Sequence, residues 1–133
     1  MLVPLGGPTA TAPGLRMWLP PGWHEIERKV TPCTNPVERI TVSGPGGGMV
    51  HLQESLEPPR NIRRFPPRPD VFILRGRPAP IACCSPIRRP GWFLRFRAAG
   101  RAFYAYVYGA TSPARRYAIQ SLGSLLVEPR PAR

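Results

Sequence analysis

The sequence is poor in the side chains that carry most enzyme chemistry. It has two histidines, His24 and His51, and seven acidic residues, of which Asp70 is the only aspartate. A nucleophile, a base and an acid would have to come from a cysteine, a histidine and a distant carboxylate, and no local motif supports such a set. Glu25 and Glu27 share one face of an expected strand, but opposing arginines explain them better as solvated charges. These scarcities predict a protein that is not an enzyme.

Cysteine is also scarce, and its positions suit neither a disulfide framework nor a metal site. The chain has an odd number of cysteines, namely Cys33, Cys83 and Cys84. The adjacent Cys83 and Cys84 do not easily form a disulfide with each other, although either could meet Cys33 across strands. Zinc accepts Cys and His ligands, so His24 and His51 would complete a candidate set, but the chain has no CxxC or HxxxH pair. We expect reduced thiols, no metal and no cofactor.

Long hydrophobic runs are missing as well. No segment approaches the roughly 20 apolar residues of a membrane span. The opening MLVPLGGPTATAPG has no basic region followed by an apolar run, which a signal peptide needs. We therefore expect a soluble, cytoplasmic protein, unless an export segment is missing. Residues 1–13 are predicted to be a disordered lead, 14–129 a single domain and 130–133 a tail.

Lysine is almost absent, whereas arginine is abundant. Lys29 is the only lysine, yet 19 basic residues against seven acidic ones give a net charge of +12. This balance favours anionic partners, namely nucleic acid, acidic protein or an anionic membrane surface. A GC-rich genome, which raises Arg, Pro, Ala and Gly at the expense of Lys, explains the same composition without a function. The 20 prolines and 13 glycines favour a loop-rich β or α+β fold over a helical bundle.

The stretch GWFLRFRAAGRAFYAYVYG, residues 91–109, predicts a β-hairpin around an Ala99-Gly100 turn. Pairing outward from the turn sets Phe96 opposite Phe103, and the next pairs on that face are Leu94 with Ala105 and Trp92 with Val107. A one-residue slip would mix apolar and polar residues, so the pattern itself favours this register. The first face is predicted to be core. The second face carries Phe93, Arg95, Arg97, Tyr104, Tyr106 and Tyr108.

Other patterns predict more strands and one terminal helix. Ser112 is expected to cap the helix and Pro113 to occupy its first turn, with an end by Glu128 because Pro129 follows. The helix has an apolar stripe of Ala118, Ile119, Leu122, Leu125 and Leu126. Strands are expected over 15–19, 23–30, 37–43, 49–56, 71–74 and 79–84, and an exposed proline- and arginine-rich loop over 57–70. The prediction is an α+β fold: an antiparallel, hairpin-rich sheet packed by a C-terminal amphipathic helix.

Two segments resemble a known family. GLRMWLPPGWHEIE looks like the strand–PPGW–strand opening of PsbP-like domains, which are small α/β/α sandwiches. A helix running into SLGSLLVEP is similar to their closing helix and last short strand, so the resemblance spans residues 14–129. The early helix of such folds is not evident here. The resemblance implies a non-catalytic accessory or adaptor module.

Two surfaces are candidate binding sites. On the second face of the hairpin, Arg95 and Arg97 interleave with Tyr104, Tyr106 and Tyr108, which suits stacking on bases or binding an acidic partner. The alternative is that the terminal helix packs on this face. At the start of the helix, Ser112, Arg115 and Arg116 could hold an anion, or the arginines could simply be solvated. We expect a binding or adaptor module, with a protein partner favoured and a nucleic-acid- or ribosome-associated protein as the alternative.

Overall fold

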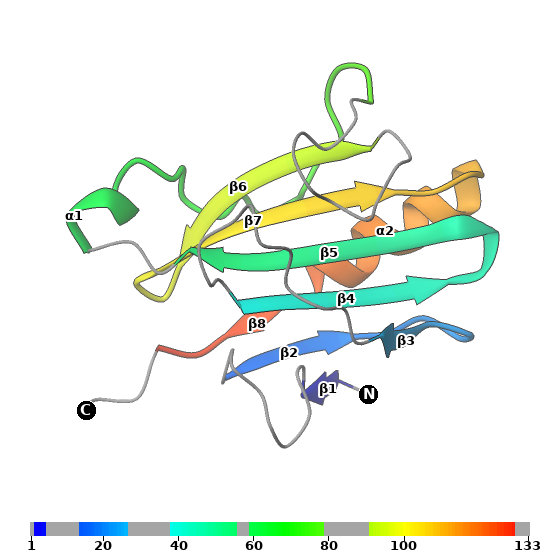
Figure 1. Ribbon diagram of the computed structural model, residues 1–133, viewed down its shortest axis with the longest axis horizontal. Helices are drawn as coiled ribbons and strands as arrows, with labels where there is room; N and C mark the ends of the chain where they lie inside the picture. Colours follow the sequence, from blue (N-terminus) through cyan, green and yellow to red (C-terminus); the bar gives the residue numbers. More distant parts are fainter. Residues whose placement is uncertain (1, 5–13, 27–37, 56–58, 79–90, 130–133) are drawn as a thin grey trace.

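The computed structural model describes residues 2–4, 14–26, 38–55, 59–78 and 91–129 (Figure 1). The tail at 130–133, the expected strand at 79–84 and all three cysteines lie outside the described residues. The elements in chain order are β1 (Leu2–Pro4), β2 (Leu15–Trp18), β3 (His24–Ile26), β4 (Glu38–Gly44), the 3₁₀ turn η1 (Pro45–Gly47), β5 (Gly48–Ser55), α1 (Pro59–Ile62), β6 (Trp92–Ala98), β7 (Arg101–Tyr108), α2 (Ser112–Gly123) and β8 (Leu126–Val127).

A five-stranded antiparallel sheet with the strand order β3-β4-β5-β7-β6 forms the centre of the fold. Each neighbouring pair is antiparallel. The predicted hairpin register is confirmed, because Phe96 pairs with Phe103, Leu94 with Ala105 and Trp92 with Val107. The turn residues Ala99 and Gly100 both have positive φ, 52° and 73°, as a two-residue hairpin turn whose twist matches the strands requires.

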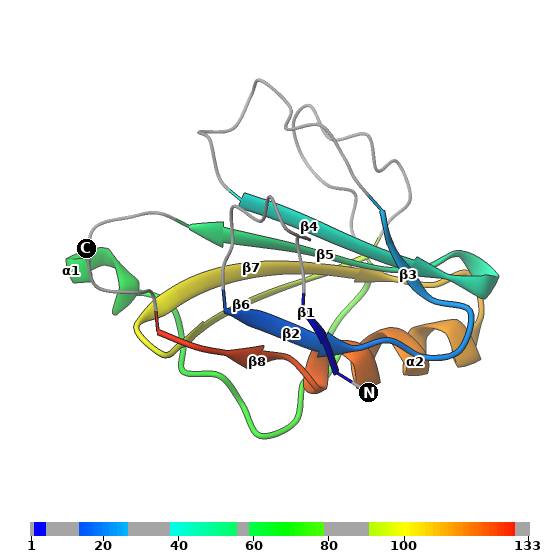
Figure 2. The same ribbon diagram turned by 90° about the horizontal axis from the view of Figure 1, so that it is seen from below.

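The second layer consists of the small sheet β1-β2-β8 and helix α2, which cover one face of the large sheet (Figures 1 and 2). We call this covered face the inner face and the opposite one the outer face. The predicted α+β fold, with a C-terminal helix packed on the sheet, is confirmed. The structure differs from the expected lead over 1–13 at Leu2–Pro4, which pairs with β2. No helix among the described residues is long and apolar enough to cross a membrane.

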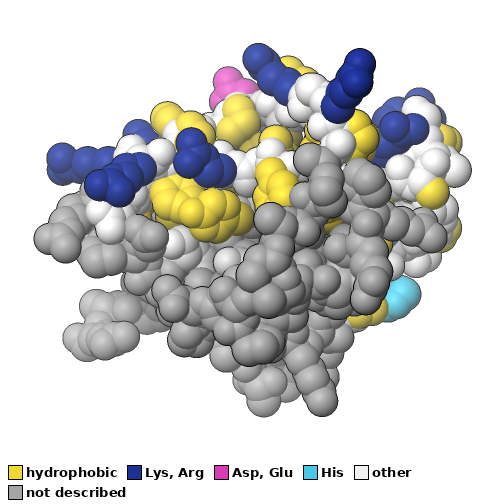
Figure 3. Space-filling view, turned by 45° about the horizontal axis from the view of Figure 1, so that its top comes forward, with side chains coloured by type: hydrophobic (Ala, Val, Ile, Leu, Met, Phe, Trp, Pro, Cys, Tyr) yellow, Lys and Arg dark blue, Asp and Glu magenta, His cyan; other side chains and the backbone are white. Residues whose placement is uncertain are grey.

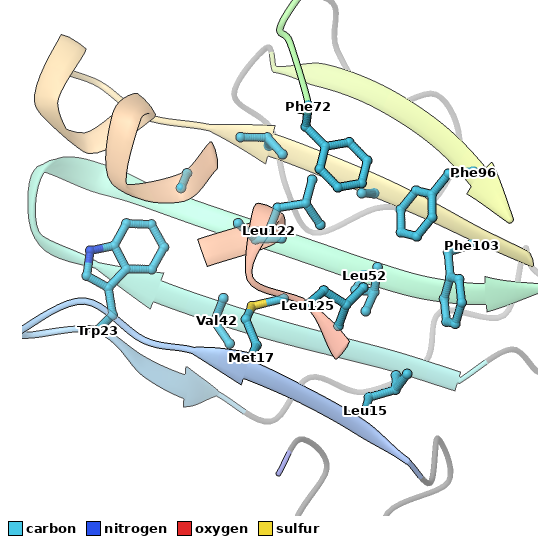
Figure 4. Close-up of a cluster of buried hydrophobic side chains, with 14 residues drawn as sticks. Leu15, Met17, Trp23, Val42, Leu52, Phe72, Phe96, Phe103, Leu122 and Leu125 are labelled. Carbon is cyan, nitrogen blue, oxygen red and sulfur yellow. The ribbon is translucent and has the colours of Figure 1, made fainter. Parts of the chain in front are cut away.

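The core lies between these two layers (Figure 4). Phe96, Phe103 and Leu52 come from the large sheet, whereas Leu122 and Leu125 come from α2 and the residues after it. At the far end, the Trp23 indole lies over the turn between β4 and β5. A Cβ at Gly44 or Gly48 would overlap that indole, so the glycine-rich turn makes room for a core side chain.

Helix α2 begins one residue earlier than the sequence suggests. Thr111, not Ser112, is the N-cap, and its Oγ1 accepts a hydrogen bond from the Ala114 N–H at 3.2 Å. The helix ends at Gly123, so that Leu126 belongs to β8 and is exposed. Ser121 of the helix and Ser124, its C-cap, hold β2: Ser121 Oγ donates to the Trp18 carbonyl at 2.7 Å, and Ser124 Oγ accepts from the Trp18 N–H at 2.8 Å.

Segment 59–78 differs most from its prediction. The expected exposed loop over 57–70 contains the short helix α1, and Phe65 is buried. The expected strand at 71–74 is irregular chain instead, and Phe72 inserts into the core with its ring 5.1 Å from that of Phe96. The segment runs beside β6, where Pro67 forms a parallel bridge with Arg97.

The expected strand over 23–30 is described only as far as Ile26, and β3 is correspondingly short. The expected strands over 37–43 and 49–56 form a hairpin, in which Val42 pairs with Val50 and the two strands turn at Gly44 and Gly48.

Candidate functional site

The eight predicted site residues fall into two groups on opposite sides of the large sheet. Arg95, Arg97, Tyr104, Tyr106 and Tyr108 lie on the outer face, since they alternate with the buried inner-face residues of β6 and β7. The second group, at the start of α2, lies on the inner side, because the helix packs there. The second group is Ser112, Arg115 and Arg116. The structure therefore does not bring the two groups into one site.

On the outer face, the aromatic side chains pack mainly on one another. Tyr106 is 1% exposed, and its ring centroid lies 4.9 Å from that of Phe93 and 5.9 Å from that of Tyr108. Burial, with a smaller contribution from Tyr108, raises the pKa of Tyr106, so its hydroxyl stays neutral. Tyr104 packs edge-on against Phe65 at 5.0 Å. The alternative that α2 covers this face is wrong, because α2 packs on the inner face.

The two arginines of the outer face have different surroundings. The Arg97 guanidinium donates to the Phe65 carbonyl at 2.5 Å, and its backbone N–H donates to the Pro66 carbonyl at 2.8 Å. Arg97 therefore fastens segment 59–78 to β6. Arg95 is exposed and lies beside Phe93, which is 51% exposed. Arg95 is thus the exposed member of this predicted group, and Phe93, which was not predicted as a site residue, is exposed beside it.

The start of α2 borders an open groove of about 610 Å³. All three predicted residues of the second group line it, so the structure brings them together. Arg115 is held in place, since its Nε donates to the Thr111 carbonyl at 3.3 Å and its guanidinium lies 5.9 Å from the centre of the Trp92 ring. The groove is lined by Phe72, Ile73, Leu74, Trp92, Ser112, Arg115, Arg116, Ile119 and Gln120.

Exposed arginines follow the edge of the large sheet that β6 and segment 59–78 form. In Figure 3, arginine side chains lie around hydrophobic ones on this side of the molecule. Asp70 is the only acidic residue of segments 59–78 and 91–123. We call this set the basic band; its exposed members are Arg63, Arg64, Arg75, Arg77, Arg95 and Arg116.

Large apolar side chains are exposed within the same region. Val71 is 68% exposed and Ile73 is 54% exposed, on either side of the buried Phe72. Phe72 holds this part of the segment against the core, so its two neighbours are presented to solvent. The sequence analysis missed this arrangement, because it expected a strand over 71–74, and a four-residue apolar run does not show which of its side chains face the core.

Three further charged side chains escaped the sequence analysis. Arg101 and Glu54 form an ion pair at the inner face, each with a side chain 2% exposed. Arg68 donates one bond to the Leu125 carbonyl and another, of 2.8 Å, to the Gly123 carbonyl. Glu54 and Arg101 lie two residues from the core residues Leu52 and Phe103 and therefore share their face of the sheet, and that spacing was a signal for the buried pair.

The histidines have separate surroundings. The His51 Nδ1 lies 2.7 Å from the Thr41 Oγ1 on the neighbouring strand, whereas His24 is exposed on β3. Within the described part of the chain, no three His, Cys, Asp or Glu side chains gather where a metal ion could bind.

A comparison with family models, curated proteins and solved structures found no match to this chain. The resemblance to PsbP-like domains therefore stays a prediction.

Proposed function

We propose that this protein is a non-enzymatic binding or adaptor module whose basic band holds an acidic protein partner. The observation that carries the proposal is the presence of exposed aliphatic side chains among arginines that form no ion pair with a carboxylate of the described residues. Charged surfaces attract partners of opposite sign over a distance, and exposed apolar patches mark places where a partner covers the surface. Segment 59–78 provides both features, with Arg75 and Arg77 close in sequence to Ile73.

A protein partner suits this surface better than a nucleic acid. Contacts with phosphate need cations, and contacts with bases favour aromatic or planar side chains. The aliphatic side chains of Val71 and Ile73 offer neither, whereas the apolar centre of a protein interface accepts them.

The proposal includes a cytoplasmic location and no cofactor. The scarcity of histidine and carboxylate side chains in the sequence supports the absence of a cofactor. His51 contacts the Thr41 hydroxyl and lies opposite Tyr106 on the neighbouring strand, beside the packed aromatic side chains of the outer face.

A nucleic-acid- or ribosome-associated role is the second candidate, and the outer face supports it. Phe93 is 51% exposed beside the exposed Arg95, and an aromatic ring next to a guanidinium suits base stacking and phosphate pairing. This pair is small, however, and the neighbouring Tyr106 is buried.

A peptide-display selection with a parallel nucleic-acid titration tests the proposal. We expect the parent protein to enrich peptides that combine acidic and aliphatic residues, and an Arg75→Glu/Arg77→Glu variant to lose them. Both replaced side chains are exposed, so the fold should persist. Homopolymer RNA and random duplex DNA should bind more weakly than the selected peptides at about 0.15 M salt. Tighter binding of nucleic acid with a steep salt dependence would instead establish the second candidate, and a selection without enrichment would refute the acidic-partner proposal.

A further inference from the structure

The groove beside α2 has an apolar floor contributed by three separate elements. Leu74 comes from segment 59–78, Trp92 from the start of β6 and Ile119 from α2. The Trp92 indole is fixed because its Nε1–H donates to the Gly76 carbonyl at 3.1 Å. The volume of about 610 Å³ falls within the range of roughly 300–1,000 Å³ that is typical of ligand pockets. The groove can therefore take up an apolar side chain together with part of the backbone that carries it.

The cations at the rim give the groove a definite charge preference. Arg115 is oriented by the Thr111 carbonyl and by the Trp92 ring, and Arg116 beside it is exposed. In the described ranges, the ion pairs are Arg16 with Glu128 and Arg101 with Glu54, and neither involves a groove residue. A carboxylate at this rim would meet two guanidinium groups without competing with a carboxylate of the described chain.

From this combination we infer that the groove recognises a short acidic segment of a protein partner. One aliphatic side chain of the segment fills the space between Leu74, Trp92 and Ile119, and a neighbouring carboxylate pairs with Arg115 and Arg116. Ile73, which is 54% exposed at the edge, extends the apolar contact beyond the floor. This inference rests on the proposed function and specifies where the partner docks and which residues it presents.

Fluorescence anisotropy with labelled peptides tests the inference. The probe is a short peptide in which a Leu-Leu pair precedes a run of glutamates, and its counterparts replace the leucines by serine or the glutamates by glutamine. We expect the parent protein to bind the Leu-Leu-glutamate peptide at least about tenfold more tightly than either counterpart, because each counterpart removes one of the two contacts.

Two charge reversals provide the matched comparison. Arg116→Glu changes the rim of the groove, and Arg16→Glu makes the same charge change at an exposed position on β2, outside the basic band. Arg116→Glu should raise the Kd about tenfold, whereas Arg16→Glu should change it by less than about threefold. Ile73→Ser should weaken binding of the Leu-Leu-glutamate peptide and leave that of its serine counterpart unchanged. Circular dichroism of each variant checks the fold.

Equal losses in Arg116→Glu and Arg16→Glu would overturn the groove as the docking site and leave a general preference for acidic chains, so the proposed function would stand. Failure of the folded parent protein to discriminate among the three peptides would also overturn the inference. The display selection with the Arg75→Glu/Arg77→Glu variant decides the proposed function separately, because neither residue lines the groove.

Discussion

The ion pair between Glu54 and Arg101 places full charges inside the molecule at the end of the core. Arg101 Nε and Nη2 lie 2.9 and 2.7 Å from the two carboxylate oxygens of Glu54, a geometry in which two parallel bonds join the groups. Arg101 Nη1 also donates to the Glu128 carbonyl at 2.8 Å. This guanidinium therefore links the large sheet to the chain that follows β8, and each buried charge depends on the other.

Removing one member of this pair should therefore cost much more than removing both. We expect Glu54→Ala to lower the free energy of unfolding by about 3–5 kcal/mol, because Arg101 then stays buried without its carboxylate. Glu54→Leu/Arg101→Met, which fills the space with apolar atoms, should lose clearly less. Urea unfolding monitored by circular dichroism measures both changes.

An exposed pair serves as the control for this prediction. Arg16 and Glu128 lie 3.8 Å apart with side chains 55% and 63% exposed, so Glu128→Ala should cost less than about 1 kcal/mol. If Glu54→Ala proves as mild as Glu128→Ala, the buried pair does not contribute to stability in the way described here.

Among the elements, segment 59–78 is held in place by side chains rather than by a ladder of strand hydrogen bonds. Phe65 and Phe72 anchor it to opposite faces of the large sheet, against Tyr104 and Phe96. Arg68 lies between these anchors and donates to the Gly123 and Leu125 carbonyls where α2 ends. A cation at this position also suits the negative end of the helix dipole, and partial burial lowers the pKa of Arg68.

Replacing Arg68 should loosen the segment without unfolding the sheet. Arg68→Ala removes charge-assisted bonds worth about 1.5–3 kcal/mol, and we expect trypsin to cleave the native protein after Arg63 or Arg64 several-fold faster. Limited proteolysis followed by mass spectrometry measures the rate at each site. Arg77→Ala, at an exposed position of the same segment, is the matched control and should leave these rates unchanged. Equal rates in the two variants would mean that Arg68 does not fasten the segment.

Sequence patterns correctly predicted the strands in which apolar and polar residues alternate, because that alternation determines which side chains are buried. The register of β6 and β7 followed from Phe96 and Phe103, because a shift by one residue would have buried arginines. Segment 59–78 has prolines and arginines in place of a repeating pattern, so only its tertiary contacts show that Phe65 and Phe72 are buried. The division of the candidate site into two groups was equally out of reach, since it depends on which face of the sheet α2 covers.

Across the whole molecule, positive charge exceeds negative charge strongly, with a net charge of +12. Exposed arginines of the basic band repel one another, and such repulsion destabilises the compact state. Added salt screens exposed charges over distances of about 8–10 Å but affects a buried pair much less. Added salt should therefore weaken the repulsion among the exposed arginines more than it weakens the attraction within the ion pairs.

We expect the melting temperature to rise by a few degrees when sodium chloride is increased from about 0.05 M to about 0.3 M. Arg64→Glu, which changes an exposed member of the basic band, should melt higher than the parent at low salt and respond less to added salt. Differential scanning fluorimetry at fixed pH measures both values. A melting temperature that falls on addition of salt would show that exposed ion pairs such as Arg16–Glu128 outweigh the repulsion.

The small sheet has a consequence for the order in which the chain can fold during its synthesis. Strand β2 leaves the ribosome early, but its partner β8 and the two serines that bond Trp18 are among the last described residues to be made. Until they emerge from the exit tunnel, the inner face of the large sheet lacks most of its cover and exposes Phe96 and Phe103. A nascent chain arrested before α2 should therefore depend on a chaperone, whereas a chain from which α2 and β8 have emerged can close the second layer.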